Sequence, residues 1–165
     1  MQMLATIGYE GSSIDDFIRT LKIAKISKII DVREIAQSRR PGFSKNILAN
    51  ELSKFGIDYV HFKALGDPKH GREAARSGRM TEFREIYTAH MERPEGLEAL
   101  RSVAEVAQCQ TSALLCFERS PKHCHRSMIA DKLSVLYTFR VVHLGVVQGN
   151  GARVNSGAFG ERVSV

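Results

Sequence analysis

Thiol, imidazole and guanidinium groups gather in one short stretch of the chain, residues 112–130. A buried apolar run over 113–116 leads to Glu118, and the loop that follows leads to Cys124, His125 and Arg126. This pattern predicts a strand, a turn and then a helix that begins at about Cys124. A helix N-terminus with basic neighbours lowers the pKa of a thiol, so Cys124 is the preferred candidate nucleophile.

Three neighbours of this cysteine have chemistry of their own. Glu118 is expected to act as a general acid or base, or to orient a histidine or an arginine. The alternative for Glu118 is an ion pair with Arg126 or Arg33 that fixes the loop. His125 and Arg126 suit an anion, because backbone N–H groups and the helix dipole favour negative charge at a helix start. We therefore predict Glu118, Cys124 and His125 as catalytic residues and Arg126 as an anion ligand.

Cys116 allows three interpretations. It is most simply a small core residue, since free cysteines are commonly buried. It is alternatively a reactive thiol, or a metal ligand together with Cys124 and His125. The spacing lacks the paired pattern of a zinc site, so no metal is predicted. With Cys109, the chain has three cysteines and no export signal, which argues against a disulfide scaffold.

Apolar runs and amphipathic segments alternate along the chain. Strands are expected at 4–8, 28–32, 57–62, 112–117 and 140–144, and helices at 14–21, 46–55, 81–91, 95–108 and 124–137. Residues 65–78 read as an irregular loop. This alternation predicts a single α/β domain over 1–145, with a mainly parallel five-stranded sheet and helices on both faces. The fold is Rossmann-like, but the turn at 8–12 lacks the dinucleotide-binding glycine pattern. Residues 146–165 form a glycine-rich tail or a small extension.

Ligands of parallel sheets bind outside the carboxyl ends of the strands. A second set of polar side chains follows the first two strands and should meet the 112–130 stretch at that edge. Arginines are well shaped to hold phosphate, and Phe43 beside them could stack on a base or pack into the core. The alternative is a solvated basic loop. The predicted anion ligands of this set are Tyr9, Arg33, Ser38, Arg39 and Arg40.

Composition narrows the class of protein. The 165 residues are 43% hydrophobic and 25% charged, which is ordinary for a globular domain. No run approaches the roughly 18 apolar residues of a membrane span, so no membrane partner and a cytoplasmic location are expected. The formal net charge of +6 favours an anionic partner, either a phosphate-bearing small molecule or a nucleic acid.

Six short blocks occur in an order that resembles the Domain of Unknown Function 488 family, small prokaryotic α/β proteins. They read TIGYEG at 6–11, DVR at 31–33, SRRPGF at 38–43, LGDP at 65–68, LCFE at 115–118 and CHR at 124–126. The resemblance covers about residues 4–145, and LGDP departs from it where a second glycine is expected. It implies the α/β fold and the place of the site, and it implies no particular reaction or cofactor.

Two functions from different classes follow from these residues. In the first, the protein binds or acts on a phosphate-bearing ligand, nucleotide or nucleic acid, at a basic pocket at the strand ends. In the second, it is a non-catalytic module that binds nucleic acid through the same arginines. A cysteine-dependent or metal-binding enzyme is a third, weaker hypothesis.

Overall fold

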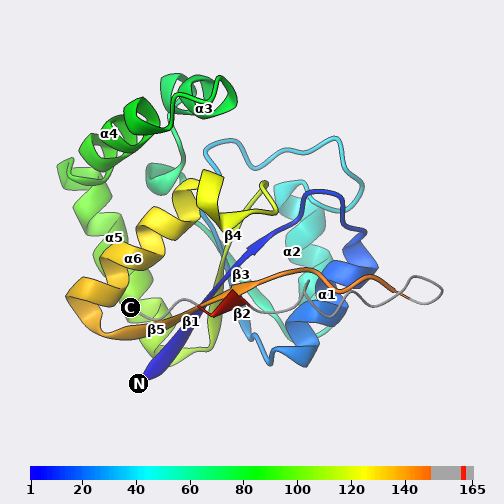
Figure 1. Cartoon of the computed structure of the whole chain (residues 1–165). Coiled ribbons are helices and arrows are strands. Elements are labelled where there is room, and N and C mark those ends of the chain that lie inside the picture. The colour runs from blue at the N-terminus through cyan, green and yellow to red at the C-terminus, as the bar shows by residue number, and fades with distance from the viewer. Residues whose placement is uncertain (150–160, 163–165) are drawn as a thin grey trace.

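Five parallel strands form the centre of the molecule (Figure 1). They are β1 (Gln2–Gly8), β2 (Lys28–Asp31), β3 (Asp58–His61), β4 (Ser112–Cys116) and β5 (Phe139–Leu144), in the spatial order β3-β2-β4-β1-β5. The computed structural model describes residues 1–149 and 161–162. The two-residue strand β6 (Glu161–Arg162) pairs antiparallel with β5. The predicted fold class, a single α/β domain with a Rossmann-like parallel sheet, is confirmed.

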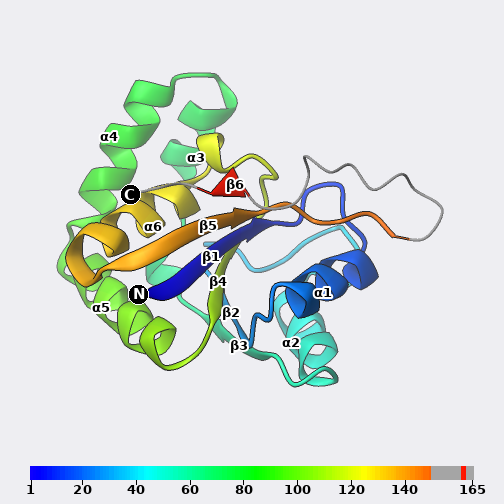
Figure 2. The ribbon, with the colours of Figure 1, turned by 60° about the horizontal axis from the view of Figure 1, so that its bottom comes forward.

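Helices cover both faces of the sheet (Figure 2). Helices α1 (Ile14–Ile23) and α2 (Lys45–Ser53) pack on one face, and α5 (Pro94–Cys109) and α6 (His125–Tyr137) pack on the other. Helices α3 (Lys69–Arg76) and α4 (Met80–Met91) pack together and extend the second layer. Two short 3-10 turns, η1 (Lys63–Leu65) and η2 (Pro121–His123), precede α3 and α6. The sheet therefore separates two apolar cores.

Local sequence explains where these elements begin. The Ser13 hydroxyl accepts a hydrogen bond from the Asp16 amide at 3.1 Å and caps α1. Pro94 occupies the first turn of α5, where its missing N–H costs nothing. Strand β4 is buried along its whole length, as expected for a strand with helices on both sides. The five strands and five helices expected from the sequence lie within a few residues of the observed ones.

The polar segment after β3 differs from the prediction. Residues 65–78 were expected to be irregular, yet they contain the end of η1 and all of α3. The sequence of helix α3 has no stripe of large apolar residues, and its buried residues are the small Gly71 and Ala74. These small residues are buried because α3 packs against α4, a contact that the sequence pattern of α3 does not predict. Of the predicted tail, Val146 is buried and Val147 hydrogen-bonds to α1, while residues 150–160 and 163–165 lie outside the described residues.

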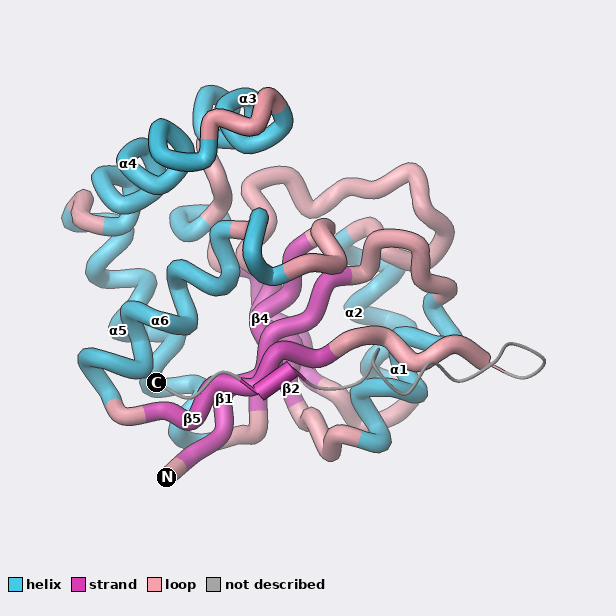
Figure 3. The backbone as a smooth tube through the Cα atoms, viewed as in Figure 1, coloured by secondary structure: helices cyan, strands magenta, loops and turns pink. Residues whose placement is uncertain are grey.

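The chain connections leave β2 and β4 in opposite directions. From β2 the chain crosses through α2 to β3 at one end of the sheet, whereas from β4 it crosses through α6 to β5 at the other. Such divergence opens a crevice between the carboxyl ends of two neighbouring strands, which is where ligands of α/β sheets bind. The loops at these strand ends lie together in Figure 3. Among the described residues, no helix combines the length and apolarity that crossing a bilayer requires.

Candidate functional site

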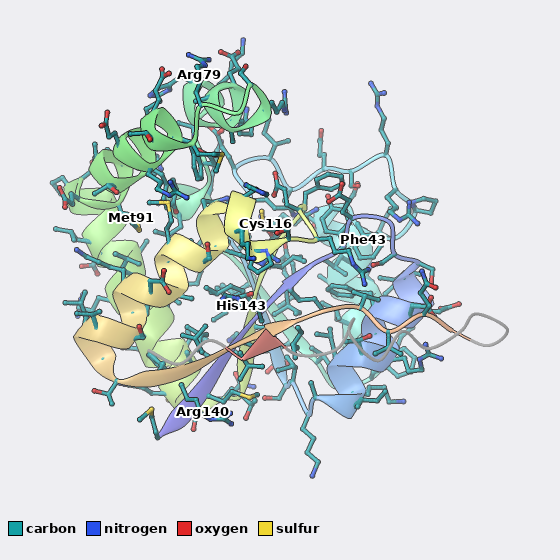
Figure 4. The ribbon with its side chains drawn as sticks, in the orientation of Figure 1. Phe43, Arg79, Met91, Cys116, Arg140 and His143 are labelled. Atoms are coloured by element: carbon teal, nitrogen blue, oxygen red, sulfur yellow. The ribbon has the colours of Figure 1, made fainter. Side chains whose placement is uncertain are left out.

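A cavity of about 400 Å³ lies at the carboxyl ends of β2 and β4. Cys116, Glu118 and His125 contribute to it from the β4–α6 side, and the loop after β2 forms the facing wall. In Figure 4, Cys116 lies near the beginning of α6, at the opposite edge of the sheet from Arg140. The other lining residues are Tyr9, Arg33, Glu34, Ile35, Gln37, Ser38, Arg39, Asp67, Arg72, Arg76 and Phe117.

Two thiols and an imidazole form the buried end of the site. The Sγ atoms of Cys116 and Cys124 lie 2.6 Å apart. Nδ1 of His125 lies 3.7 Å from the first sulfur and 3.8 Å from the second. Nε2 of His125 donates to the Val32 carbonyl at 2.7 Å, which leaves Nδ1 directed at the sulfurs. All three side chains are at most 5% exposed.

The electrostatics of this cluster separate the two thiols. Burial raises the pKa of Cys116 well above its ordinary value. Burial also opposes ionisation of Cys124, but the hydrogen bond with Cys116 and the positive charge of His125 outweigh it and lower the pKa of Cys124 well below its ordinary value. Cys124 is also the N-cap residue of α6, where its Sγ accepts from the Arg126 amide at 3.5 Å. The electrostatics therefore favour ionisation of Cys124 over ionisation of Cys116.

The thiolate in turn keeps His125 charged. Burial lowers the pKa of His125, but the neighbouring Cys124 thiolate more than reverses this effect and raises it to about 9. Oε2 of Glu118 lies 2.9 Å from the Cys116 sulfur. Burial, followed by the negative charge of Cys124, raises the pKa of Glu118. These shifts favour a thiolate–imidazolium pair at Cys124 and His125, beside a Glu118 carboxyl group whose pKa is raised.

Arg126 positions the loop that carries Glu118. Its guanidinium donates to the Glu118 carbonyl at 2.5 Å and to the Arg119 carbonyl at 3.1 Å, and its Nε donates to Thr6 at 3.2 Å. The side chain is fully buried, and its partners at Glu118 and Arg119 are backbone carbonyls. The carboxylate of Glu118 instead contacts the Cys116 sulfur. Arg126 therefore positions Glu118 through its backbone carbonyl and not through an ion pair with its side chain.

Arg33 is similarly engaged. It forms an ion pair with Asp31 at 2.7 Å and donates to the Phe43 carbonyl at 2.8 Å and to the Tyr9 hydroxyl at 3.3 Å. The Tyr9 ring stacks on Phe43 with centroids 4.4 Å apart. Phe43 is fully buried, so it packs into the core and is not exposed for stacking on a base. Tyr9 and Arg33 line the cavity from within this packed group.

The remaining predicted anion ligands lie in the loop after β2. Ser38 and Arg39 line the cavity, and Arg39 is exposed. Arg40 is directed elsewhere, since its Nε donates to the Ser12 carbonyl. Among the predicted site residues, the structure thus groups Glu118, Cys116, Cys124 and His125 tightly. It sets Tyr9, Arg33, Ser38 and Arg39 on the wall of the same cavity, while Arg40 and Arg126 are held by backbone carbonyls.

Several lining residues were not singled out from the sequence, and three of them are charged residues of one segment. Asp67 and the two arginines of α3, Arg72 and Arg76, come from the segment after β3. Arg72 pairs with Glu34 and donates to the Asp67 carbonyl at 2.6 Å. Asp67 is 6% exposed, and its Oδ1 has no hydrogen-bond partner within the part of the chain that the structure describes. Burial raises the pKa of Asp67 to about 6. The rule that ligands bind at strand ends pointed to this segment, without indicating which residues face inward.

The thiol–imidazole cluster also has the composition of a metal-binding set. The candidate ligand atoms of Cys116, Cys124 and His125 all lie within 4.8 Å of one another. Sulfurs that share a tetrahedral zinc ion stand roughly 3.8 Å apart, from Zn–S bonds of about 2.3 Å. The observed separation of 2.6 Å is much shorter. Zinc binding would therefore require the two sulfurs to move apart.

The fold and the cavity define a small α/β protein with a thiol–imidazole cluster at the carboxyl edge of a Rossmann-like sheet. The chain belongs to the family described as "Domain of unknown function DUF488", whose model matches residues 13–133. Comparisons with curated proteins and with solved structures find no match. The family membership confirms the resemblance seen in the sequence and carries no activity with it.

Proposed function

We propose that this protein is an enzyme that binds a small phosphate-bearing ligand of nucleotide size in the cavity at the carboxyl edge of the sheet. The observation that carries the proposal is that Arg39, Glu118 and His125 face one cavity of about 400 Å³. A volume of this order suits a small molecule, since ligand pockets span about 300–1,000 Å³. Concavity favours such a ligand over a nucleic-acid strand, which tracks an extended basic groove.

We assign two roles to the arginines of the site, namely contact with phosphate and support of the cavity walls. Arg39 and Arg76 are exposed at the cavity and are suited to contact phosphate oxygens directly. Arg72 shares its charge with Glu34, and Arg33 with Asp31. We assign these two, together with Arg126, to holding the walls of the cavity. Ser38 and Tyr9 supply hydroxyl groups on the same wall.

Glu118 and His125 supply the chemistry. Glu118 faces the cavity with a raised pKa, so it can hold a proton for a leaving group or remove one from a nucleophile. The imidazolium of His125 adds positive charge at the buried end of the cavity, where charge that develops on a phosphoryl oxygen would be stabilised. Cys124 is assigned to keeping His125 protonated. The reaction class is thus proton-assisted transfer or hydrolysis at a phosphate-bearing centre.

Calorimetric titration tests the binding step. We expect adenosine monophosphate to bind and adenosine not to bind, because the phosphate makes the charged contacts. Arg39→Gln should weaken the nucleotide by about tenfold, the effect of roughly 1.4 kcal/mol in an arginine–phosphate contact. Arg140→Gln removes the same charge from an exposed position at the opposite edge of the sheet and should leave affinity unchanged. Equal weakening by both variants would contradict the proposal.

Glu118→Gln separates catalysis from binding. If Glu118 transfers a proton, this variant should bind the nucleotide as well as the natural protein does, or better, because a negative charge has left the cavity. Turnover measured as phosphate or nucleoside release should fall by about 10²-fold or more. Undiminished turnover would remove Glu118 from the mechanism and leave only the binding step.

A further inference from the structure

We infer that Cys116 and Cys124 are a reversible oxidation site, at which a hydroperoxide converts the two thiols into an intramolecular disulfide. The geometry that points to this is the contact of their sulfurs at 2.6 Å, with Cys116 lining the cavity and Glu118 and His125 beside the pair. This inference does not depend on the phosphate-bearing ligand, because it concerns only the sulfur atoms and a small peroxide that enters the same cavity.

The two sulfurs are placed for a bond without rearrangement of the fold. A disulfide bond is about 2.05 Å long, so the sulfurs must approach each other by only about half an ångström. Cys116 ends β4 and Cys124 caps α6, and both backbones are fixed by the elements that they terminate. Zinc binding would require the opposite movement, by about 1 Å. The observed geometry is therefore closer to the disulfide than to a metal site.

Access decides which sulfur reacts first. Cys116 lines the cavity, whereas Cys124 does not contribute to its wall. Glu118, whose carboxylate lies 2.9 Å from the Cys116 sulfur, can take the thiol proton as the peroxide arrives. A nearby base that removes this proton compensates for the raised pKa of Cys116. Cys124, already ionised behind it, is the resolving thiolate.

The chemical steps balance. In the first step, Glu118 takes the proton of Cys116, and the resulting thiolate attacks the terminal oxygen of the hydroperoxide. The S–O bond forms and the O–O bond breaks, and the departing alkoxide or hydroxide takes the proton from Glu118. Cys116 is then a sulfenic acid. The two sulfur electrons that it has given up have reduced the peroxide to an alcohol or to water.

In the second step, the Cys124 thiolate attacks the sulfur of the Cys116 sulfenic acid. The S–S bond forms and the S–O bond breaks, and the hydroxide that leaves takes a proton from the His125 imidazolium as water. Nδ1 of His125 lies 3.7 and 3.8 Å from the two sulfurs, which places the proton donor beside the leaving oxygen. A dithiol reductant returns the pair to its starting state by thiol–disulfide exchange.

The experiment treats fully reduced protein with hydrogen peroxide. The variant Cys109→Ser serves as the starting protein, because Cys109 is the exposed cysteine and would add intermolecular disulfides. We expect the two remaining thiols to disappear together, with a mass loss of two hydrogen atoms and a proteolytic peptide that joins Cys116 to Cys124. Dithiothreitol should restore both thiols. Loss of the thiols to sulfinic or sulfonic acids without the joined peptide would overturn the inference.

Single cysteine variants test the order of the steps in the same background. With Cys124→Ser, the sulfenic acid on Cys116 has no partner and should be trapped by dimedone. With Cys116→Ser, Cys124 should react about tenfold more slowly, because it does not line the cavity. A faster reaction at Cys124 would overturn the assigned order. Metal analysis of the reduced protein completes the test, since zinc bound in equal amount to protein at this pair would also overturn the inference.

Discussion

At the scale of single residues, the site depends on charged side chains whose partners are inside the protein. Cys124 lies beside the imidazole of His125, and Arg33 forms an ion pair with Asp31. Arg126 donates hydrogen bonds to three oxygen atoms. A buried charge persists only when it is paired and hydrogen-bonded, so these contacts explain why the cations can lie so deep. Residue types alone revealed the cations, but a sequence does not show which acceptors surround a guanidinium.

Asp67 is a buried acid whose Oδ1 has no hydrogen-bond partner among the described residues, and this predicts a pH-dependent stability. Burial raises its pKa to about 6 from 3.8 in the unfolded chain. The unfolded chain therefore loses its proton first, and stability falls as pH rises from about 4 to about 6. Asp67→Asn should unfold with a free energy higher by about 1–2 kcal/mol above pH 6, after allowance for partial solvent screening.

Urea unfolding as a function of pH measures this difference between variant and natural protein. It should vanish below about pH 3, where both side chains are neutral in both states. Glu73→Gln is the control, because it removes an equal charge from an exposed position on the neighbouring helix α3. A difference that is constant across the pH range would show that Asp67 acts through packing and not through its charge.

Arg126 gives a second residue-scale prediction. Arg126→Met keeps the apolar volume but leaves the carbonyls of Glu118 and Arg119 without their donor. Unpaired buried acceptors should lower the free energy of unfolding by about 2–4 kcal/mol, measured by urea denaturation. Arg119→Met is the matched control, since Arg119 is exposed and should change stability by less than about 0.5 kcal/mol. Similar losses in both variants would argue against a positioning role for Arg126.

At the scale of elements, the end of β1 and the loop after β4 fit against each other. A Cβ atom on Gly8 would lie 1.8 Å from the Glu118 carbonyl oxygen. Gly8→Ala must therefore push the loop away from β1 and from Arg126. We expect a loss of about 1–3 kcal/mol in urea unfolding, the usual cost of overpacking, and slower peroxide oxidation of Cys116 as Glu118 moves away.

Gly11 in the same turn provides the comparison for Gly8. It has a φ of 73° and open space where a Cβ would stand. Asparagine tolerates this left-handed conformation, so Gly11→Asn should leave both unfolding and oxidation nearly unchanged. If both variants behaved alike, the close approach of β1 to the β4 loop would not be what positions Glu118.

Elements with strong apolar patterns could be predicted, and those without could not. The sequence predicts β2 and β4 from their continuous apolar runs, and α5 from its apolar stripe. Helix α3 does not, because it contains Gly71 and buries only small residues against α4. The carboxyl-edge rule pointed to the edge of the sheet at which the cavity lies, but the strand order and the inward-facing residues of α3 depend on long-range packing. Hence Arg72, Arg76 and Asp67 were found only from the structure.

At the scale of the whole molecule, a net charge of +6 and a concave cavity imply different binding behaviour, and salt separates them. A nucleic acid that lies along a basic surface releases one counterion for each phosphate contacted, so its affinity falls steeply with salt. Under the proposed function, a mononucleotide in the cavity would contact the protein through one phosphate group. We expect the logarithm of its association constant to fall with the logarithm of salt with a slope of only about −1 to −2.

A titration of adenosine monophosphate and of a single-stranded oligonucleotide, each at several sodium chloride concentrations, measures both slopes. The mononucleotide should show the shallow slope and lose affinity in Arg39→Gln. The oligonucleotide should bind weakly and respond equally to Arg39→Gln and Arg140→Gln, because only general charge attracts it. A tightly bound oligonucleotide with a slope steeper than about −4 would reverse the conclusion, since it requires about six phosphate contacts on single strands. Such contacts extend beyond the cavity, and the protein would then be a nucleic-acid-binding module.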